Sequence, residues 1–193
     1  QRVREQLMLG ASQIKLTAGG GVASPHSPLD VSTFTLEELR AAVEAATNWG
    51  TYVSVHAYTP TAVRRAIDAG VKVIEHAHLI DDATAGYMAE KGIWLSTQPF
   101  LADETSPFPP GSDQYLKQRE VVEGTAVIYG FARKYHIKTA FGTDILFSEA
   151  QARRQGFLLA ELTRWFTPAE SLRMATSTNG ELLALSGLRS PYK

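Results

Sequence analysis

Two histidines, an aspartate and a lysine stand at the ends of short apolar runs, and together they could hold divalent metal ions. His56 and His76 each close such a run, and Asp144 comes two residues after another. Neutral imidazole and carboxylate groups are ligands for zinc, manganese, iron or cobalt in hydrolytic sites. Because the chain has no cysteine, thiolate zinc sites, disulfides and cysteine nucleophiles are excluded.

Lys15 lies in the first apolar run, just before the glycine-rich segment 17–21. An ammonium group would repel a metal ion. A buried lysine with a lowered pKa can instead react with carbon dioxide and form a carbamate, an anion whose two oxygens can bridge two cations. We therefore expect Lys15 to act as a fourth ligand in its carbamate form.

The elements that must position these residues alternate along the whole chain. Strands are expected at 13–17, 52–56, 71–76, 93–97 and 138–142. Helices are expected at 35–48, 61–69, 82–91, about 114–135, 155–165 and 169–185. This alternation is typical of βα units around a parallel sheet, where the carboxyl ends of the strands share one edge. Five units fit either the second half of an eight-stranded (β/α)8 TIM barrel or an open doubly wound sheet.

Composition and charge limit the classes of partner that the protein is expected to bind. The chain has 193 residues, 44% of them hydrophobic, and no low-complexity segment or linker, so one domain over residues 1–193 is expected. The net charge is -1, which favours neither nucleic acid nor an anionic membrane as a partner. No apolar run approaches the roughly 18 residues of a transmembrane helix. The sequence does not distinguish a cytoplasmic from a periplasmic protein.

Four motifs resemble the amidohydrolase superfamily, and within it the imidazolonepropionase-like and Xaa-Pro dipeptidase (prolidase-like) branch. The motifs are Ile14-Lys15-Leu16-Thr17-Ala18-Gly19-Gly20-Gly21-Val22, Val55-His56-Ala57-Tyr58, Ile74-Glu75-His76-Ala77-His78-Leu79-Ile80-Asp81-Asp82 and Ala140-Phe141-Gly142-Thr143-Asp144. The resemblance covers nearly the whole chain and implies barrel strands four to eight of a metal-dependent hydrolase.

The resemblance also implies a role for each motif residue. Carboxylated Lys15 would bridge two divalent metal ions, with zinc as the first choice. His56 and His76 would bind the second metal, and Asp144 would bind the first metal and carry a proton as the catalytic residue. The His-x-His pair of strand one and the flanking β-sandwich would lie outside residues 1–193, so we expect a missing N-terminal segment to be required for a complete site.

Two further residues are candidates for binding the substrate. Tyr58 directly follows the His56 motif and, by resemblance, would offer its hydroxyl to a substrate carboxylate; packing on the barrel rim is the alternative. His78 is expected in the pocket or behind a metal ligand. Gln98 and the pair Arg153 and Arg154 are weaker candidates, and the irregular segment 99–113, rich in proline, is expected to cover the site.

The function expected from these residues is hydrolysis of an amide or peptide bond, in a dipeptide or an N-acyl amino acid, by a metal-activated hydroxide. Two alternatives stay open. The chain could be a half-barrel without activity of its own, serving as an interaction piece or an inactive remnant, or the same metals could cleave a lactone or phosphoester. Unpaired sheet edges also favour a homo-oligomer.

Overall fold

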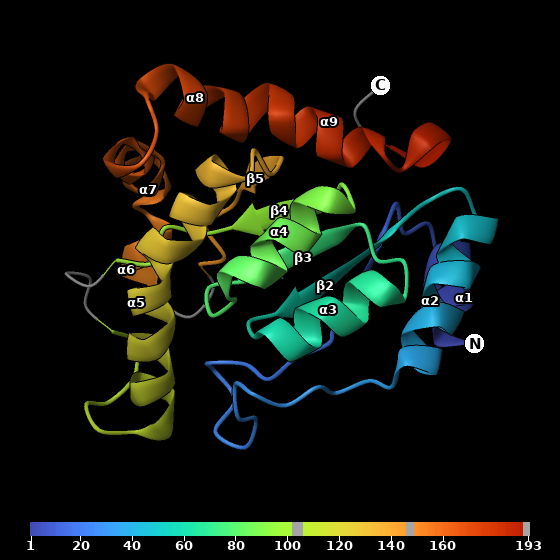
Figure 1. Cartoon of the computed structure of the whole chain (residues 1–193), viewed down its shortest axis with the longest axis horizontal. Coiled ribbons are helices and arrows are strands. Elements are labelled where there is room, and N and C mark those ends of the chain that lie inside the picture. The colour runs from blue at the N-terminus through green and yellow to red at the C-terminus, as the bar shows by residue number, and fades with distance from the viewer. Residues whose placement is uncertain (102–105, 146–148, 191–193) are drawn as a thin grey trace.

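A five-stranded parallel sheet forms the centre of the computed structural model, which describes residues 1–101, 106–145 and 149–190. The strands are β1 (Ile14–Thr17), β2 (Val53–Ala57), β3 (Val73–His76), β4 (Trp94–Thr97) and β5 (Thr139–Phe141), in the spatial order β1-β2-β3-β4-β5 (Figure 1). A doubly wound sheet reverses its strand order at a switch point. The sequential order excludes that alternative and matches consecutive strands of a barrel.

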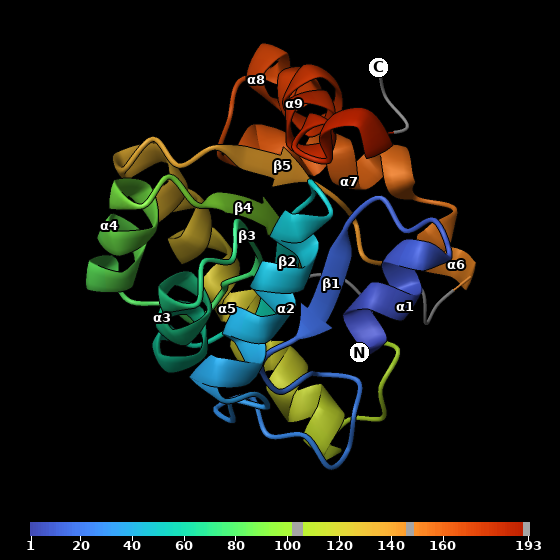
Figure 2. The same cartoon turned by 90° about the vertical axis from the view of Figure 1, so that its right-hand side faces the viewer.

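A helix connects each strand to its neighbour. These helices are α2 (Leu36–Asn48), α3 (Pro60–Asp68), α4 (Asp82–Glu90) and α5 (Asp113–Lys134). Right-handed crossovers between adjacent parallel strands place all the connecting helices on the same face of the sheet. Figure 2 shows them around the outside of the curved sheet. The expected strands and connecting helices are thereby confirmed, with bounds shifted by one or two residues.

Local signals explain where the helices begin and end. Thr35 and Glu38 form the capping box at the start of α2, each side chain accepting from the other's backbone N–H. The loops after α2, α3 and α4 begin at glycines with positive φ: Gly50 at 73°, Gly70 at 94° and Gly92 at 64°. These residues adopt the left-handed conformation that ends a helix without a Cβ penalty.

The two faces of the sheet have opposite character. Val55, Ile74 and Leu95 are completely buried against the connecting helices. Residues at alternate positions point the other way, toward the inside of the curved sheet, because side chains alternate along a strand. Near the carboxyl ends this inner face is polar and carries His56 and Glu75, which are paired in the β2–β3 register.

The C-terminal helices close the other end of the inner face. They are α6 (Glu149–Ala152), α7 (Gln155–Glu161), η1 (Leu162–Arg164), α8 (Pro168–Arg173), η2 (Met174–Thr178), α9 (Asn179–Ala184) and η3 (Gly187–Arg189), and α1 (Arg2–Met8) precedes β1. Leu182 of α9 packs on Tyr52 and Trp94 at the amino ends of β2 and β4. The side-chain amide of Asn179 bonds both the N–H and the carbonyl of Phe141, at 3.0 and 2.8 Å. The Asn179 side chain thus makes the kind of hydrogen bonds to the β5 backbone that a neighbouring strand would make.

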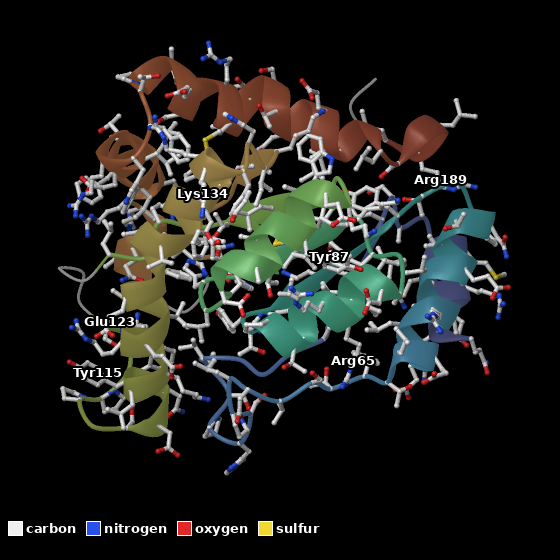
Figure 3. The ribbon with its side chains drawn as sticks, viewed as in Figure 1. Arg65, Tyr87, Tyr115, Glu123, Lys134 and Arg189 are labelled. Atoms are coloured by element: carbon white, nitrogen blue, oxygen red, sulfur yellow. The ribbon has the colours of Figure 1, made fainter. Side chains whose placement is uncertain are left out.

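The side chains drawn in Figure 3 show the long polar groups spread over the outer helices, as Arg65, Tyr87 and Lys134 illustrate. Lys134 pairs with Asp82 across α5 and α4 at 2.5 Å. Such exposed pairs contribute little to stability.

No helix in the described part of the chain combines the length and apolar character needed to cross a lipid bilayer.

Candidate metal and substrate site

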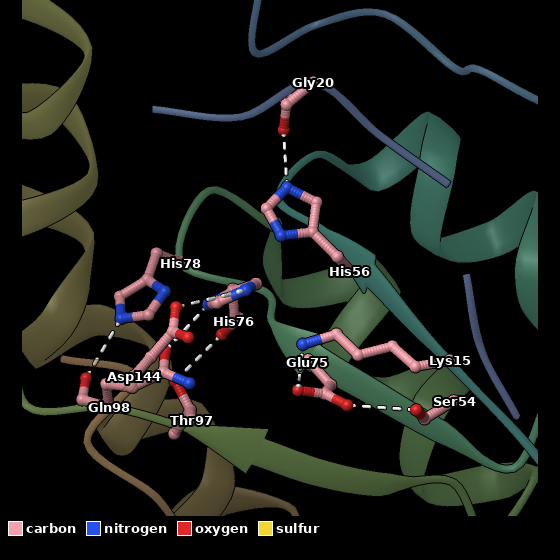
Figure 4. Close-up of polar contacts among 10 residues, drawn as sticks. All are labelled: Lys15, Gly20, Ser54, His56, Glu75, His76, His78, Thr97, Gln98 and Asp144. Carbon is pink, nitrogen blue, oxygen red and sulfur yellow. Dashed lines mark hydrogen bonds and ion pairs between the residues drawn. The ribbon is translucent and has the colours of Figure 1, made fainter. Parts of the chain in front are cut away.

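Three of the four expected metal ligands come together at the carboxyl ends of the strands (Figure 4). The rings of His56 and His76 meet edge to face, with centroids 4.5 Å apart. Asp144 Oδ2 lies 3.9 Å from His76 Nε2. The parallel register brings these groups to one edge, since β2, β3 and β5 all run in the same direction.

The tautomer of His56 follows from its partner. Its Nε2 lies 2.7 Å from the carbonyl oxygen of Gly20, which can only accept, so Nε2 carries the proton. The loop can approach this closely because residue 20 has no side chain: a Cβ there would lie 1.6 Å from the Pro28 carbonyl oxygen. Burial, the largest effect, lowers the pKa of His56. The ring is therefore neutral near pH 7, and its Nδ1 keeps a free lone pair.

His76 has the opposite tautomer from His56. Its Nδ1 lies 2.7 Å from Gln98 Oε1, again an acceptor, so Nδ1 carries the proton and Nε2 has the free lone pair. Burial, and next the nearby His56 and His78, lower the pKa of His76 well below its usual value. Because the ring is neutral, its 3.9 Å approach to Asp144 is not an ion pair.

The lone pairs of His76 Nε2 and Asp144 Oδ2 face each other and suit binding to divalent cations. Two acceptors without a proton between them repel, whereas zinc binds histidine nitrogen and carboxylate oxygen at about 2.0 to 2.2 Å each. Burial, the largest effect, raises the pKa of Asp144, and the charge of Lys15 opposes this effect in part. The donor set therefore suits a divalent ion. Within the described ranges, however, no three His, Asp or Glu side chains already form a metal cluster.

Strained backbone marks the same place. His76, Ala77 and Asp144 have positive φ angles of 76°, 56° and 51°, although none of them is glycine. Such conformations cost free energy and persist only where the surroundings impose them, as at functional sites. One such constraint is Thr97, whose hydroxyl donates to the His76 carbonyl at 2.9 Å.

Lys15 is oriented differently from the other expected ligands. Its Nζ lies 2.9 Å from Glu75 Oε2, and its side chain is 48% exposed because β1 is an edge strand of the sheet. Ser54 donates to the other oxygen of Glu75 at 3.0 Å. Lys15 is thus paired with Glu75, and its side chain is more exposed than expected from the sequence. Glu75 was not singled out from the sequence, although it directly precedes His76 in the same motif.

A cavity of about 310 Å³ opens beside these groups. One end is formed by Lys15, Thr17, His56, His76 and Asp144, and the rest of the wall is largely apolar, including Val22, Phe100, Leu101, Pro107, Phe108, Val121 and Val122. Lys15 and Asp144 are the formally charged residues among the described lining. The cavity therefore has a polar end suited to chemistry and an apolar end suited to a hydrophobic group.

Tyr58 and His78 take different positions around this cavity. Tyr58 lines the cavity, where its ring stacks on His76 at 5.0 Å, and burial raises the pKa of its hydroxyl. His78 is 2% exposed, is not among the described lining residues, and donates from Nε2 to the Gln98 carbonyl at 3.1 Å. Its ring packs behind the wall against Phe100, with centroids 5.0 Å apart.

The other residues considered from the sequence lie outside the cavity wall. Gln98 sits behind His76, and Arg153 pairs with Glu149 on α6 at 2.6 Å. The segment 99–113 does reach the cavity through Phe100, Leu101, Pro107 and Phe108. Residues 102–105 of that segment lie outside the described ranges.

The loop after β1 is held over the cavity by α5, a contact that sequence reasoning missed. Lys117 Nζ donates to the carbonyls of Gly21, at 2.8 Å, of Ser27, at 3.1 Å, and of Ser24. The Gly21 N–H in turn donates to Ser27 Oγ at 3.3 Å. The loop that carries the His56 partner Gly20 is therefore tied to the helix that carries the apolar wall.

The fold and site together define part of a TIM-type barrel, the class whose active sites lie at the carboxyl ends of the strands. Residues 1–188 match the sequence model of the amidohydrolase family, and the chain belongs to that family. Ochratoxinase from Aspergillus niger is 30% identical over 180 residues, which are 91% of this chain and 37% of the relative.

Solved structures of other proteins also resemble this chain. An amidohydrolase crystal structure is 38% identical with a TM-score of 0.87, over 95% of this chain and 45% of the other. A prolidase complexed with N-methylphosphonate-L-proline is 33% identical with a TM-score of 0.87, over 96% and 46%. A Xaa-Pro dipeptidase with bound methionine is 28% identical with a TM-score of 0.78, over 95% and 46%. The chain thus spans less than half the length of these relatives.

Proposed function

We propose that the protein is a metal-dependent amidohydrolase that cleaves the amide bond of a dipeptide or an N-acyl amino acid. The observation that carries this proposal is that His56, His76 and Asp144 line one cavity, with the two imidazole centroids 4.5 Å apart and Asp144 Oδ2 3.9 Å from His76 Nε2. The names of the prolidase and Xaa-Pro dipeptidase relatives support a peptide-type substrate.

Two divalent ions, zinc in the first instance, are proposed as cofactors. His56 and His76 would hold one ion, and Asp144 the other. Lys15 would leave Glu75 and lose a proton, and its neutral amine would then react with carbon dioxide, releasing a second proton, to form a carbamate whose oxygens could serve as ligands for the ions. When bound, the ions would polarise the scissile carbonyl and make water more acidic.

The chain's own residues would transfer the proton and orient the substrate. Asp144 would accept a proton from the attacking water and pass it to the leaving nitrogen, so the bond breaks without a covalent intermediate. Tyr58, which lines the cavity, would donate from its hydroxyl to the substrate carboxylate. The apolar wall of α5 and the segment around Phe100 favours a substrate whose side chain or acyl group is hydrophobic.

Hydrolysis by the zinc-loaded chain tests the proposal. A panel should contain apolar and charged dipeptides, N-acyl amino acids, a lactone and a phosphotriester. It should be run on this chain alone and on this chain joined to a segment that supplies a His-x-His pair. We expect amide substrates with a hydrophobic group to be cleaved and a chelator to stop the reaction.

Matched variants make the result specific. Asp144→Asn should lower kcat by about 10²-fold to 10⁴-fold, the usual contribution of a general acid or base. Asp30→Asn, at an exposed loop position, should leave kcat unchanged. Cleavage of the lactone or phosphotriester alone would replace the proposed substrate class. No turnover by the joined protein would favour the half-barrel without activity.

A further inference from the structure

We propose that Gln98 is a positioning residue that selects the tautomer of His76 and so keeps His76 Nε2 available for a metal ion. This inference rests on the proposed function, in which His76 is a metal ligand. Gln98 directly follows β4 and its side chain is buried. It does not line the cavity among the described residues, so any effect it has must act through His76.

Gln98 contacts both His76, the last residue of β3, and His78, which lies in the turn after it. Its side-chain Oε1 accepts from His76 Nδ1 at 2.7 Å, while its backbone oxygen accepts from His78 Nε2 at 3.1 Å. The preceding Thr97 holds the His76 carbonyl at 2.9 Å. Thr97 and Gln98 thus make three hydrogen bonds to the strained turn at the end of β3, which Figure 4 marks with dashed lines.

The side-chain contact decides between two states of the imidazole ring. With Gln98 Oε1 as acceptor, the proton stays on Nδ1 and the Nε2 lone pair faces Asp144. Without this acceptor, a proton on Nδ1 would be buried without a partner, which is unfavourable. The proton would move to Nε2 and be donated to Asp144, which is 3.9 Å away in the present arrangement. That hydrogen bond would occupy the lone pair and the carboxylate oxygen that a metal ion needs.

The amide is suited to this task because its oxygen accepts without carrying a charge. Residues that orient a metal-bound histidine through its second nitrogen typically change metal affinity by 10-fold to 100-fold when they are replaced. His76 has such a partner in Gln98, and His56 has one in the Gly20 carbonyl. Only the Gln98 contact is made by a side chain, so it can be removed by substitution without changing the backbone.

Nitrogen-proton correlation spectra of the metal-free chain, labelled with ¹⁵N-histidine, test the inference directly at pH 8. In the wild type we expect His76 to be protonated on Nδ1 and His78 on Nε2. Gln98→Met removes the acceptor at similar size and should move the His76 proton to Nε2. Gln98→Glu keeps an oxygen acceptor and should retain the wild-type His76 pattern. Zinc affinity should fall 10-fold to 100-fold in the Met variant and recover at least in part in the Glu variant.

His78 is an internal control because its partner is the Gln98 backbone oxygen, which every variant keeps. An unchanged His78 signal shows that the turn is intact. If the Met variant does not fold, Gln98→Asn can replace it. The asparagine side chain is one methylene shorter, so its oxygen lies farther from His76 Nδ1, and we expect the same tautomer shift. A His76 proton that stays on Nδ1 in the folded Met or Asn variant would overturn the inference.

The tautomer measurement is also independent of metal and substrate. If the His76 proton shifts in the Met variant but the chain binds no zinc, the positioning role of Gln98 is supported. The absence of zinc binding then counts against the proposed function and leaves the positioning role intact. Zinc affinity that stays within twofold of the wild type despite the shift would overturn the link between Gln98 and the metal.

Discussion

Replacing Gly124 with alanine should destabilise the protein and disturb the site at the same time. Gly124 lies within α5 where the helix crosses the end of β3. A Cβ at this position would lie 2.0 Å from the carbonyl oxygen of His78 and 2.8 Å from its carbonyl carbon. Both atoms belong to the backbone of the turn after His76, so no flexible side chain can move aside.

The expected magnitude follows from this geometry. α5 would have to move by about 1 Å to bring the new contact to the 3.0 Å limit that real Cβ atoms respect. Overpacking of this kind costs typically about 1 to 3 kcal/mol, and alanine returns up to about 1 kcal/mol through its higher helix propensity. With the full return of about 1 kcal/mol, we expect a net loss of up to about 2 kcal/mol, together with displacement of the apolar wall at Val121.

Gly130 is the matched control because it lies in the same helix and a Cβ there would meet nothing within 4 Å. Gly130→Ala should stabilise the chain by about 0.5 to 1 kcal/mol. Urea unfolding monitored by circular dichroism gives both free energies of unfolding. If Gly124→Ala were as stable as Gly130→Ala, the close packing of α5 on the His78 turn would be refuted.

Three further predictions concern the surroundings of the site. Lys117→Met should speed hydrogen exchange of the Gly21 amide at least about tenfold, since bonds from a charged donor contribute about 1.5 to 3 kcal/mol; an unchanged rate would refute the tie between the loop and α5. Glu75→Gln should strengthen the ¹³C carbamate signal of Lys15 under labelled bicarbonate, because it removes the anion that favours the ammonium; a weaker signal would mean that Glu75 promotes carbamate formation. Burial, followed by the charge of Glu75, raises the pKa of Tyr52 to about 12 from 10.0. The unfolded state therefore loses this proton first as pH rises, and up to about 2 kcal/mol of stability should be lost between pH 10 and 12; Tyr52→Phe should flatten this loss, and an unchanged slope would show that Tyr52 does not cause it.

The order of the elements could be predicted from the sequence because its signals are local. Apolar runs of four to six residues, capping boxes and helix-ending glycines such as Gly50 act within a few neighbours. The order of the strands in space is not a local property. The alternation of strands and helices alone therefore left a barrel segment and a doubly wound sheet open; the family resemblance favoured the barrel, and the pairing of the strands confirms it.

The site was predictable to the extent that strand ends share one edge. This rule brings His56, His76 and Asp144 together. It does not predict that Lys15 turns to Glu75, because that pair depends on the register of three strands. The role of Gln98 likewise depends on which way a buried amide points, and no periodicity in the sequence carries that information.

Zinc titration of the metal-free chain, followed with a competing chromophoric chelator, tests the central claim most directly. The claim is that His56, His76 and Asp144 together form a metal site at the carboxyl ends of the strands. We predict that His76→Ala and Asp144→Ala each weaken zinc binding by at least tenfold, while His26→Ala, at an exposed loop position, binds as the wild type does. Equal zinc affinity in all four proteins would contradict the proposed site.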